Sequence, residues 1–271
     1  MGNCRKRLLI SFLLNLIMII LFIASIINEI VDIHNNPDSV YQTVWGLFRY
    51  FTIDGNLLSC IFNFIISFKQ YQALRMQNEK DVQEKTISHF LYIISLISAC
   101  DEIVIFVVVM FIFLPMSNTE WIIGLIGTYK SSSVHITIPL ILAFRFLFLD
   151  RRKNDLRLLE KLSGGIPMCL YGTIMFILCG AKLFKSFDKK DGDGKIPYPF
   201  LDVYHQDWYF CTFIAMFIFI FGFGMSFLFD FLNKKFEKLI LPYDLIGEDS
   251  VEGDSEKKLF IDSMRNEDEQ I

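Results

Sequence analysis

The sequence predicts an all-α fold, a polytopic membrane protein built as a bundle of six transmembrane helices. The 271-residue chain is 53% hydrophobic and holds 29 phenylalanines, which is typical of a membrane protein and not of a soluble domain. Its apolar residues form six runs of about the length needed to cross a bilayer. Lysine and arginine gather in alternate connections between these runs. They are spread over several loops, so nothing indicates nucleic-acid binding.

The six runs cover residues 8–31, 44–68, 87–114, 128–149, 166–184 and 208–232. The first is about twice as long as the apolar core of a signal peptide and shows no small-residue cleavage site, so we expect it to be retained. Residues 1–240 then form one membrane domain. Residues 241–271 hold ten acidic and three basic residues, and we expect a disordered cytoplasmic tail.

Basic residues set the predicted orientation. Fifteen of them lie at the N-terminus, after the second and fourth runs, and after the sixth, whereas Lys189, Lys190 and Lys195 on the other side lie among acidic residues. Cytoplasmic loops carry the excess of positive charge. We therefore expect a multi-pass protein of the cell membrane with cytoplasmic N and C termini.

A polar stripe marks the second run. Thr52, Asn56, Ser59 and Asn63 are spaced i, i+4, i+7 and i+11, so they share one face of a helix. Unpaired polar groups in hydrocarbon cost several kcal/mol, so this face must meet protein or water. It either holds helices together or lines a site.

Thr52 and His135 are the candidate catalytic pair. Thr52 lies about 12 Å from the outer end of the second run, and His135 lies about 10 Å into the fourth run, which is parallel to it. Histidine is the usual base that activates a hydroxyl nucleophile, and Asn56 could donate to a developing oxyanion. Alternatively, Thr52 bonds its own helix backbone and His135 bonds across helices.

Four ionisable residues lie in apolar surroundings, where such residues are costly and usually functional. Asp54 or Asp101 could orient a protonated His135 as the third member of a triad. Asp101 and Glu102 are adjacent and point about 100° apart, so at most one readily faces the site. The same acids would serve a proton or cation pathway. Arg145 is nearer the cytoplasmic end, where we expect it to snorkel or to pair with an acid.

The neighbours of His135 have two interpretations. Ser131 and Ser132, one turn earlier, could fix the imidazole tautomer or simply solvate the helix end. Pro139 removes the backbone donor that would reach the His135 carbonyl, and we expect the helix to be disturbed there.

The outer loop after the fifth run is rigid and aromatic, and we expect it to act as a lid on the outer mouth of the bundle. It does not match a calcium loop, because Ile196 stands where an EF-hand needs glycine. His34 and His205 lack metal-ligand spacing with His135. We therefore predict no metal and no cofactor. The lid residues are Pro197, Tyr198, Pro199, Phe200 and Asp202.

Several stretches resemble the Pr-six-Pr family of bacterial six-span membrane proteins. They are Tyr50–Leu58, His135–Leu140, Pro167 with Tyr171, and Pro197–Asp202. The resemblance covers roughly residues 8–232 and excludes the acidic tail.

More distantly, the chain is similar to the androgen-induced and androgen-dependent membrane proteins, intramembrane threonine hydrolases that cleave fatty-acid esters of hydroxy fatty acids. In that family an aromatic or apolar pair precedes the catalytic threonine early in the second helix, and a histidine stands in the outer part of the fourth. Phe51-Thr52 and His135 occupy the corresponding places. The stretch Asp54–Asn56 and Arg145 are not features of that family, which puts the lipid substrate in question more than the pair.

The predicted function is thus an intramembrane hydrolase of fatty-acyl esters, with membrane lipid as substrate and the bilayer as its surroundings. A small-solute or proton-coupled transporter that uses the buried acids is the alternative from another class. A non-enzymatic membrane scaffold, in which the polar stripe only packs helices, is the third. The sequence does not determine the oligomeric state.

Overall fold

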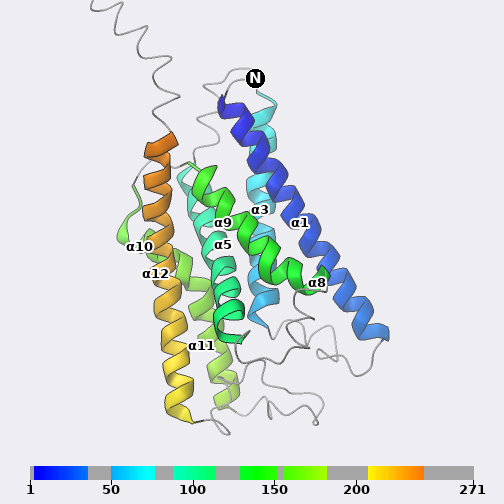
Figure 1. The fold of residues 1–271 in the computed structure, drawn as a ribbon, viewed down its shortest axis with the longest axis vertical. Coiled ribbons are helices and arrows are strands. Elements are labelled where there is room, and N and C mark those ends of the chain that lie inside the picture. Colours follow the sequence, from blue (N-terminus) through cyan, green and yellow to red (C-terminus); the bar gives the residue numbers. More distant parts are fainter. Residues whose placement is uncertain are drawn as a thin grey trace, which may run out of the picture.

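The computed structural model describes residues 3–35, 50–76, 88–113, 129–151, 155–181 and 207–240. Every regular element in these ranges is a helix. Five helices are long and apolar enough to cross a membrane, and the fourth predicted run is present as a shorter apolar helix, Ser133–Phe148. The first residues of the chain's first helix and the end of its last lie at the same end of the bundle (Figure 1).

The elements follow one another without strands in the described ranges. They are α1 (Asn3–Asn35), α3 (Phe51–Leu74), α5 (His89–Val107) with the π-helical η1 (Val108–Phe113), α8 (Tyr129–Ser132), the π-helical η2 (Ser133–Thr137), α9 (Ile138–Phe148), α10 (Leu158–Leu162), the 3-10 turn η3 (Ser163–Gly165), α11 (Ile166–Gly180) and α12 (Trp208–Ile240).

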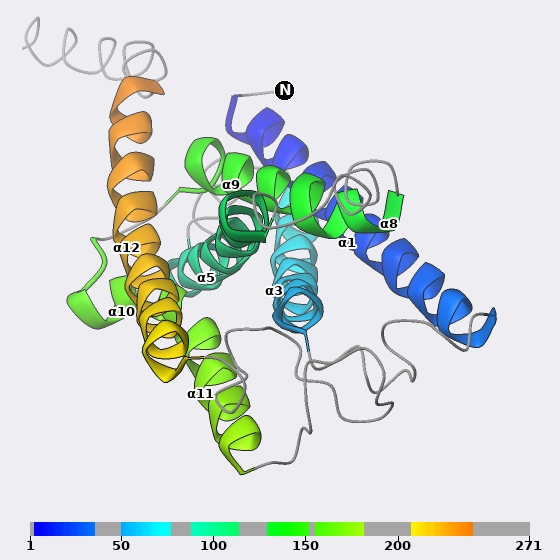
Figure 2. The same cartoon turned by 60° about the horizontal axis from the view of Figure 1, so that its bottom comes forward.

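Helix α5 is the centre of the bundle. Eleven of its nineteen residues are buried, whereas α11 buries three of fifteen. Helices α1, α3 and α9 lie on one side of α5, and α11 and α12 lie on the other (Figure 2). Leu96, Phe146 and Phe229 from α5, α9 and α12 belong to one cluster of the apolar core. Burial on every side explains why α5 has no solvent- or lipid-facing stripe.

Helix ends differ from the predicted spans. Helix α12 continues to Ile240, eight residues beyond the apolar run, and α1 continues to Asn35. Hydropathy marks the part of a helix that suits hydrocarbon, and the lysines and glutamate that follow in α12 are good helix formers as well. Helix α3 begins at Phe51; the predicted start of that span, residues 44–49, lies outside the described residues.

The fourth segment changes its helical geometry at His135. Residues Ser133–Thr137 form a π-helical turn, and Pro139 is the second residue of α9. Proline has no backbone N–H to give to the carbonyl four residues earlier, and an extra residue in the turn is one way to accommodate this loss. The expected disturbance at Pro139 is therefore confirmed, and it places His135 inside the π-turn.

Two glycines allow close approach of α12 to its neighbours. A Cβ atom on Gly164 of η3 would lie 2.5 Å from Ser226 Oγ and 2.9 Å from Cys100 Sγ. On Gly222 it would lie 2.1 Å from Met168 Cε of α11, whereas Gly224 faces open space. Gly222 therefore lies in close contact with α11, whereas Gly224 has no close neighbour.

Candidate functional site

An apolar cavity of about 280 Å³ lies at the start of α3, between that helix, α5 with η1, α11 and α12. Its wall includes Val104 of α5, Met168 of α11 and Ile218 of α12. Phe51 packs against Tyr171 at 5.1 Å between ring centroids, and both rings line the cavity. Apolar walls with few polar groups suit an apolar ligand such as an acyl chain.

Thr52 lies on the wall of this cavity. It is half-buried at the start of α3, and two more threonines line the same space, Thr173 on α11 and Thr212 on α12. Threonine residues therefore line the cavity from three helices. His135 is not among the lining residues.

Asn56 joins the turn that carries Thr52 to the turn that carries His135. Its Nδ2 donates to the Thr52 carbonyl at 2.7 Å and to the Val134 carbonyl at 3.3 Å. Val134 directly precedes His135 in the π-turn. The predicted polar face of α3 thus contacts the predicted partner segment, and Asn56 is fully buried between them.

The two candidate catalytic side chains are near this contact without a bond between them. The described contacts include no hydrogen bond from Thr52 Oγ1 to His135, and His135 Nδ1 is buried without a hydrogen-bond partner. The Oδ1 atom of Asn56 is likewise buried and unpartnered. Three groups with catalytic capacity therefore lie on two facing turns, and Thr52 is the one of these three residues that lines the cavity.

The described contacts include none between the His135 imidazole and the predicted supporting residues. Asp54 is half-buried in the first turn of α3, and neither Asp54 nor Asp101 forms an ion pair with the imidazole. Ser131 is half-buried in α8. The carbonyl of Ser132 accepts a hydrogen bond from Thr137 Oγ1 at 3.4 Å.

Asp101 and Glu102 lie deep in the bundle, with 1% and 0% of their surfaces exposed. All four of their carboxyl oxygens lack a hydrogen-bond partner. Ser59 of α3, also fully buried, faces the Glu102 carboxyl, and its hydroxyl forms no hydrogen bond of ordinary geometry. A carboxyl group in such a place needs a proton, a cation or a ligand's donor.

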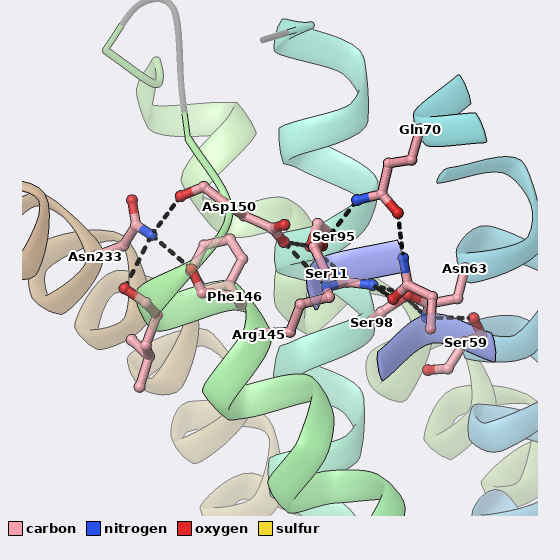
Figure 3. Close-up of polar contacts among 12 residues, drawn as sticks. Ser11, Ser59, Asn63, Gln70, Ser95, Ser98, Arg145, Phe146, Asp150 and Asn233 are labelled. Carbon is pink, nitrogen blue, oxygen red and sulfur yellow. Dashed lines mark hydrogen bonds and ion pairs between the residues drawn. The ribbon is translucent and has the colours of Figure 1, made fainter. Parts of the chain in front are cut away.

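A network around Arg145 is the largest polar feature of the interior (Figure 3). The guanidinium is fully buried and donates to Asp150 Oδ2 from Nε at 3.2 Å. It also donates to Asn15, Asn63 and Ser95, on α1, α3 and α5. Of the two expectations for Arg145, pairing with an acid is confirmed. Snorkelling is wrong, because neighbouring helices enclose the side chain.

The network extends to both sides of Arg145. On the α1 side, Asn15 donates to Gln70 Oε1 at 2.9 Å and Gln70 donates to Ser11 Oγ at 2.8 Å. On the α12 side, Asn233 Nδ2 donates to the carbonyls of Phe146 at 2.6 Å and Asp150 at 3.1 Å. These bonds satisfy the end of α9 and tie five helices together.

Sequence reasoning did not identify this network as a unit. The signal was present as Ser11 and Asn15 spaced i, i+4 in the first run, and as Gln70 one further heptad along the stripe of the second. Periodicity can assign each of these residues to a helix face. It gave no way to find that three such faces meet at one arginine.

Part of the predicted site lies outside the described residues. This holds for the lid residues Pro197, Tyr198, Pro199, Phe200 and Asp202, for His205 and for the acidic tail at 241–271.

The comparisons with known proteins give no relative. No protein-family model matches the chain, and neither a curated protein nor a solved structure is significantly similar to it. The class of the protein is therefore defined by its fold and geometry alone. It is an all-helical protein with several helices suited to a membrane, an apolar cavity and a buried polar network.

Proposed function

We propose that the protein is an intramembrane hydrolase of fatty-acyl esters, with Thr52 as nucleophile and His135 as general base. The observation that carries the proposal is the position of Thr52, on the wall of the apolar cavity and joined through Asn56 to the turn of His135. The cavity would hold the acyl chain, and the ester group would lie beside Thr52.

The reaction would proceed in two steps. His135 removes the proton from the Thr52 hydroxyl, whose oxygen attacks the ester carbonyl carbon. His135 then gives the proton to the departing alcohol, which leaves an acyl-threonine. Water, activated by His135, hydrolyses that ester to a free acid and restores Thr52. Asn56 would have to turn its Nδ2 from the backbone carbonyls to stabilise the oxyanion.

The protein would sit in the cell membrane with six spans and both termini cytoplasmic, as the distribution of basic residues favours. The reacting groups would then lie in the outer part of the bundle, where water from outside can reach the acyl-enzyme. The start of α1 and the end of α12 lie at the same end of the bundle, which agrees with an even number of spans (Figure 1).

A fluorophosphonate probe with a long alkyl chain tests the nucleophile on membranes that contain the full chain. We expect labelling of wild type and of Thr52→Ser, and loss of labelling in Thr52→Ala. Thr212→Ala is the matched control, because Thr212 lines the same cavity from another helix. His135→Gln should slow labelling by about 10²-fold or more, the usual contribution of a general base. Equal labelling of Thr52→Ala and wild type would rule out this nucleophile.

A second candidate, transport of a proton or small solute, rests on the unpartnered carboxyl groups of Asp101 and Glu102. Flux into proteoliposomes that Asp101→Asn abolishes and Thr52→Ala leaves unchanged would favour it. If Thr52→Ala instead lowers only thermal stability and neither labelling nor flux is found, the scaffold function remains.

A further inference from the structure

We infer that Glu102, Ser59 and Asn56 form a binding site for a monovalent cation between α3 and α5. The inference rests on neither the hydrolase nor the transport proposal, because a bound ion can serve a structural purpose alone. It also goes beyond the sequence, which shows no metal-ligand spacing.

The register of α3 against α5 places these residues together. The helices are antiparallel, with Asn63 Nδ2 at 3.5 Å from Ser98 Oγ at one level. Towards the other end, a Cβ atom on Gly55 would lie 3.0 Å from Ile105 Cδ1. Ser59 and Glu102 lie between these two contacts and face each other. Asn56 is three residues before Ser59, on the same face of α3.

The oxygen atoms of these three residues outnumber the hydrogen-bond donors around them. Apart from the contact between Ser59 and Glu102 themselves, the carboxyl oxygens of Glu102, the hydroxyl oxygen of Ser59 and Oδ1 of Asn56 are buried without a hydrogen-bond partner. Each of the three residues has 0% of its surface exposed. Buried polar groups are nearly always paired, so four unpaired oxygen atoms on two facing helices indicate a ligand that supplies positive charge.

Two cations of the bundle, the buried Arg145 and the partly exposed Lys161, are already bound to other groups. Arg145 is held by Asp150, Ser95, Asn63 and Asn15. Lys161 pairs with Asp230 at 3.4 Å. Neither of these cations neutralises Glu102.

The donor set favours an alkali cation. One carboxylate with a hydroxyl and an amide oxygen balances a single positive charge and offers only hard oxygen ligands. In the described part of the chain, no three His, Cys, Asp or Glu side chains gather as a metal cluster. Asp101 is adjacent to Glu102 but points about 100° away from it on the helix.

Binding of ²²Na⁺ to the full chain, purified in detergent in choline chloride buffer at fixed ionic strength, tests the site. We expect saturable binding to wild type that unlabelled NaCl displaces. Glu102→Gln removes the charge and keeps the shape, and it should weaken binding by about tenfold or more, since lost ligands cost at least that. Ser59→Ala, which removes one oxygen, should weaken binding less.

Glu160→Gln is the control, because Glu160 is partly exposed and already bonds His89 at 2.9 Å; it should bind ²²Na⁺ like wild type. If Glu102→Gln does not yield a monodisperse protein, Ser59→Ala decides alone. No saturable binding to wild type would mean that protons alone balance the carboxyl group and would overturn the inference. So would equal binding by wild type and both site variants. If wild type binds ²²Na⁺ but is not labelled by the fluorophosphonate, only the hydrolase proposal is rejected.

Discussion

Replacing Arg145 with methionine should destabilise the protein strongly. Its guanidinium joins α9 to α1, α3 and α5 through Asn15, Asn63 and Ser95. Hydrogen bonds between membrane helices average about 0.6 kcal/mol each, so the three neutral partners contribute about 2 kcal/mol together. Asp150 would lose its cation as well, and breaking a buried ion pair costs about 3–5 kcal/mol.

The Asp150 side chain is 12% exposed, so water reaches it in part and reduces the ion-pair contribution to about 1–3 kcal/mol. Together with the three neutral partners, the loss should be about 3–5 kcal/mol. At about 2–4 °C per kcal/mol for a chain of this size, Tm should fall by roughly 6–20 °C. Thermal unfolding in detergent, followed by a thiol-reactive dye at the buried cysteines, measures the shift.

A surface ion pair provides the control. Lys234 pairs with Asp155 at 3.0 Å, and their side chains are 28% and 75% exposed. Lys234→Met should therefore cost about 0–1 kcal/mol. Adding Asp150→Asn to Arg145→Met should restore part of the loss, because the second change removes the unpaired charge. The reasoning is refuted if Arg145→Met and Lys234→Met melt at the same temperature.

Three further predictions concern packing, the cavity and a helix end. Gly164→Ala should cost about 1–3 kcal/mol by overpacking against Ser226, whereas Gly224→Ala, which faces open space, should be neutral or slightly stabilising. Melting curves of the two variants compare these effects, and equal Tm values would contradict the packing described for η3. Ala215→Phe, on the cavity wall, should reduce labelling by a long-chain fluorophosphonate more than by a short-chain one, and an equal effect on both probes would argue against acyl binding there. Asn233→Leu removes the donor to the last carbonyls of α9 and should cost about 1–3 kcal/mol, while an unchanged Tm would show that these carbonyls find other partners.

The sequence predicts much of what a single helix determines. Hydropathy gives the all-α class and the apolar helices, because helices long enough to span a bilayer need about twenty apolar residues. The spacing of Asn56, Ser59 and Asn63 predicts one buried polar face, and all three are fully buried. Pro139 predicts the disturbance at His135, since the missing donor acts within four residues.

Contacts between helices could not be predicted from the sequence. The pattern around Thr52 and His135 gives their depth, but the bond from Asn56 to the Val134 carbonyl depends on which helices touch. Depth is a property of one chain segment, whereas contact depends on the rotation and tilt of two.

Tertiary structure alone decided how the ionisable residues are used. Asp101, Glu102 and Arg145 were all predicted to lie in apolar surroundings, and nothing in their local sequence shows which of them would find a partner. Packing supplied Arg145 with Asp150 and three neutral partners and left the carboxyl oxygens of Asp101 and Glu102 without any. The amino-acid sequence determined that these groups would lie in apolar segments, because hydropathy is local. Which of them would find a partner was decided by the register of four helices, which no single segment encodes.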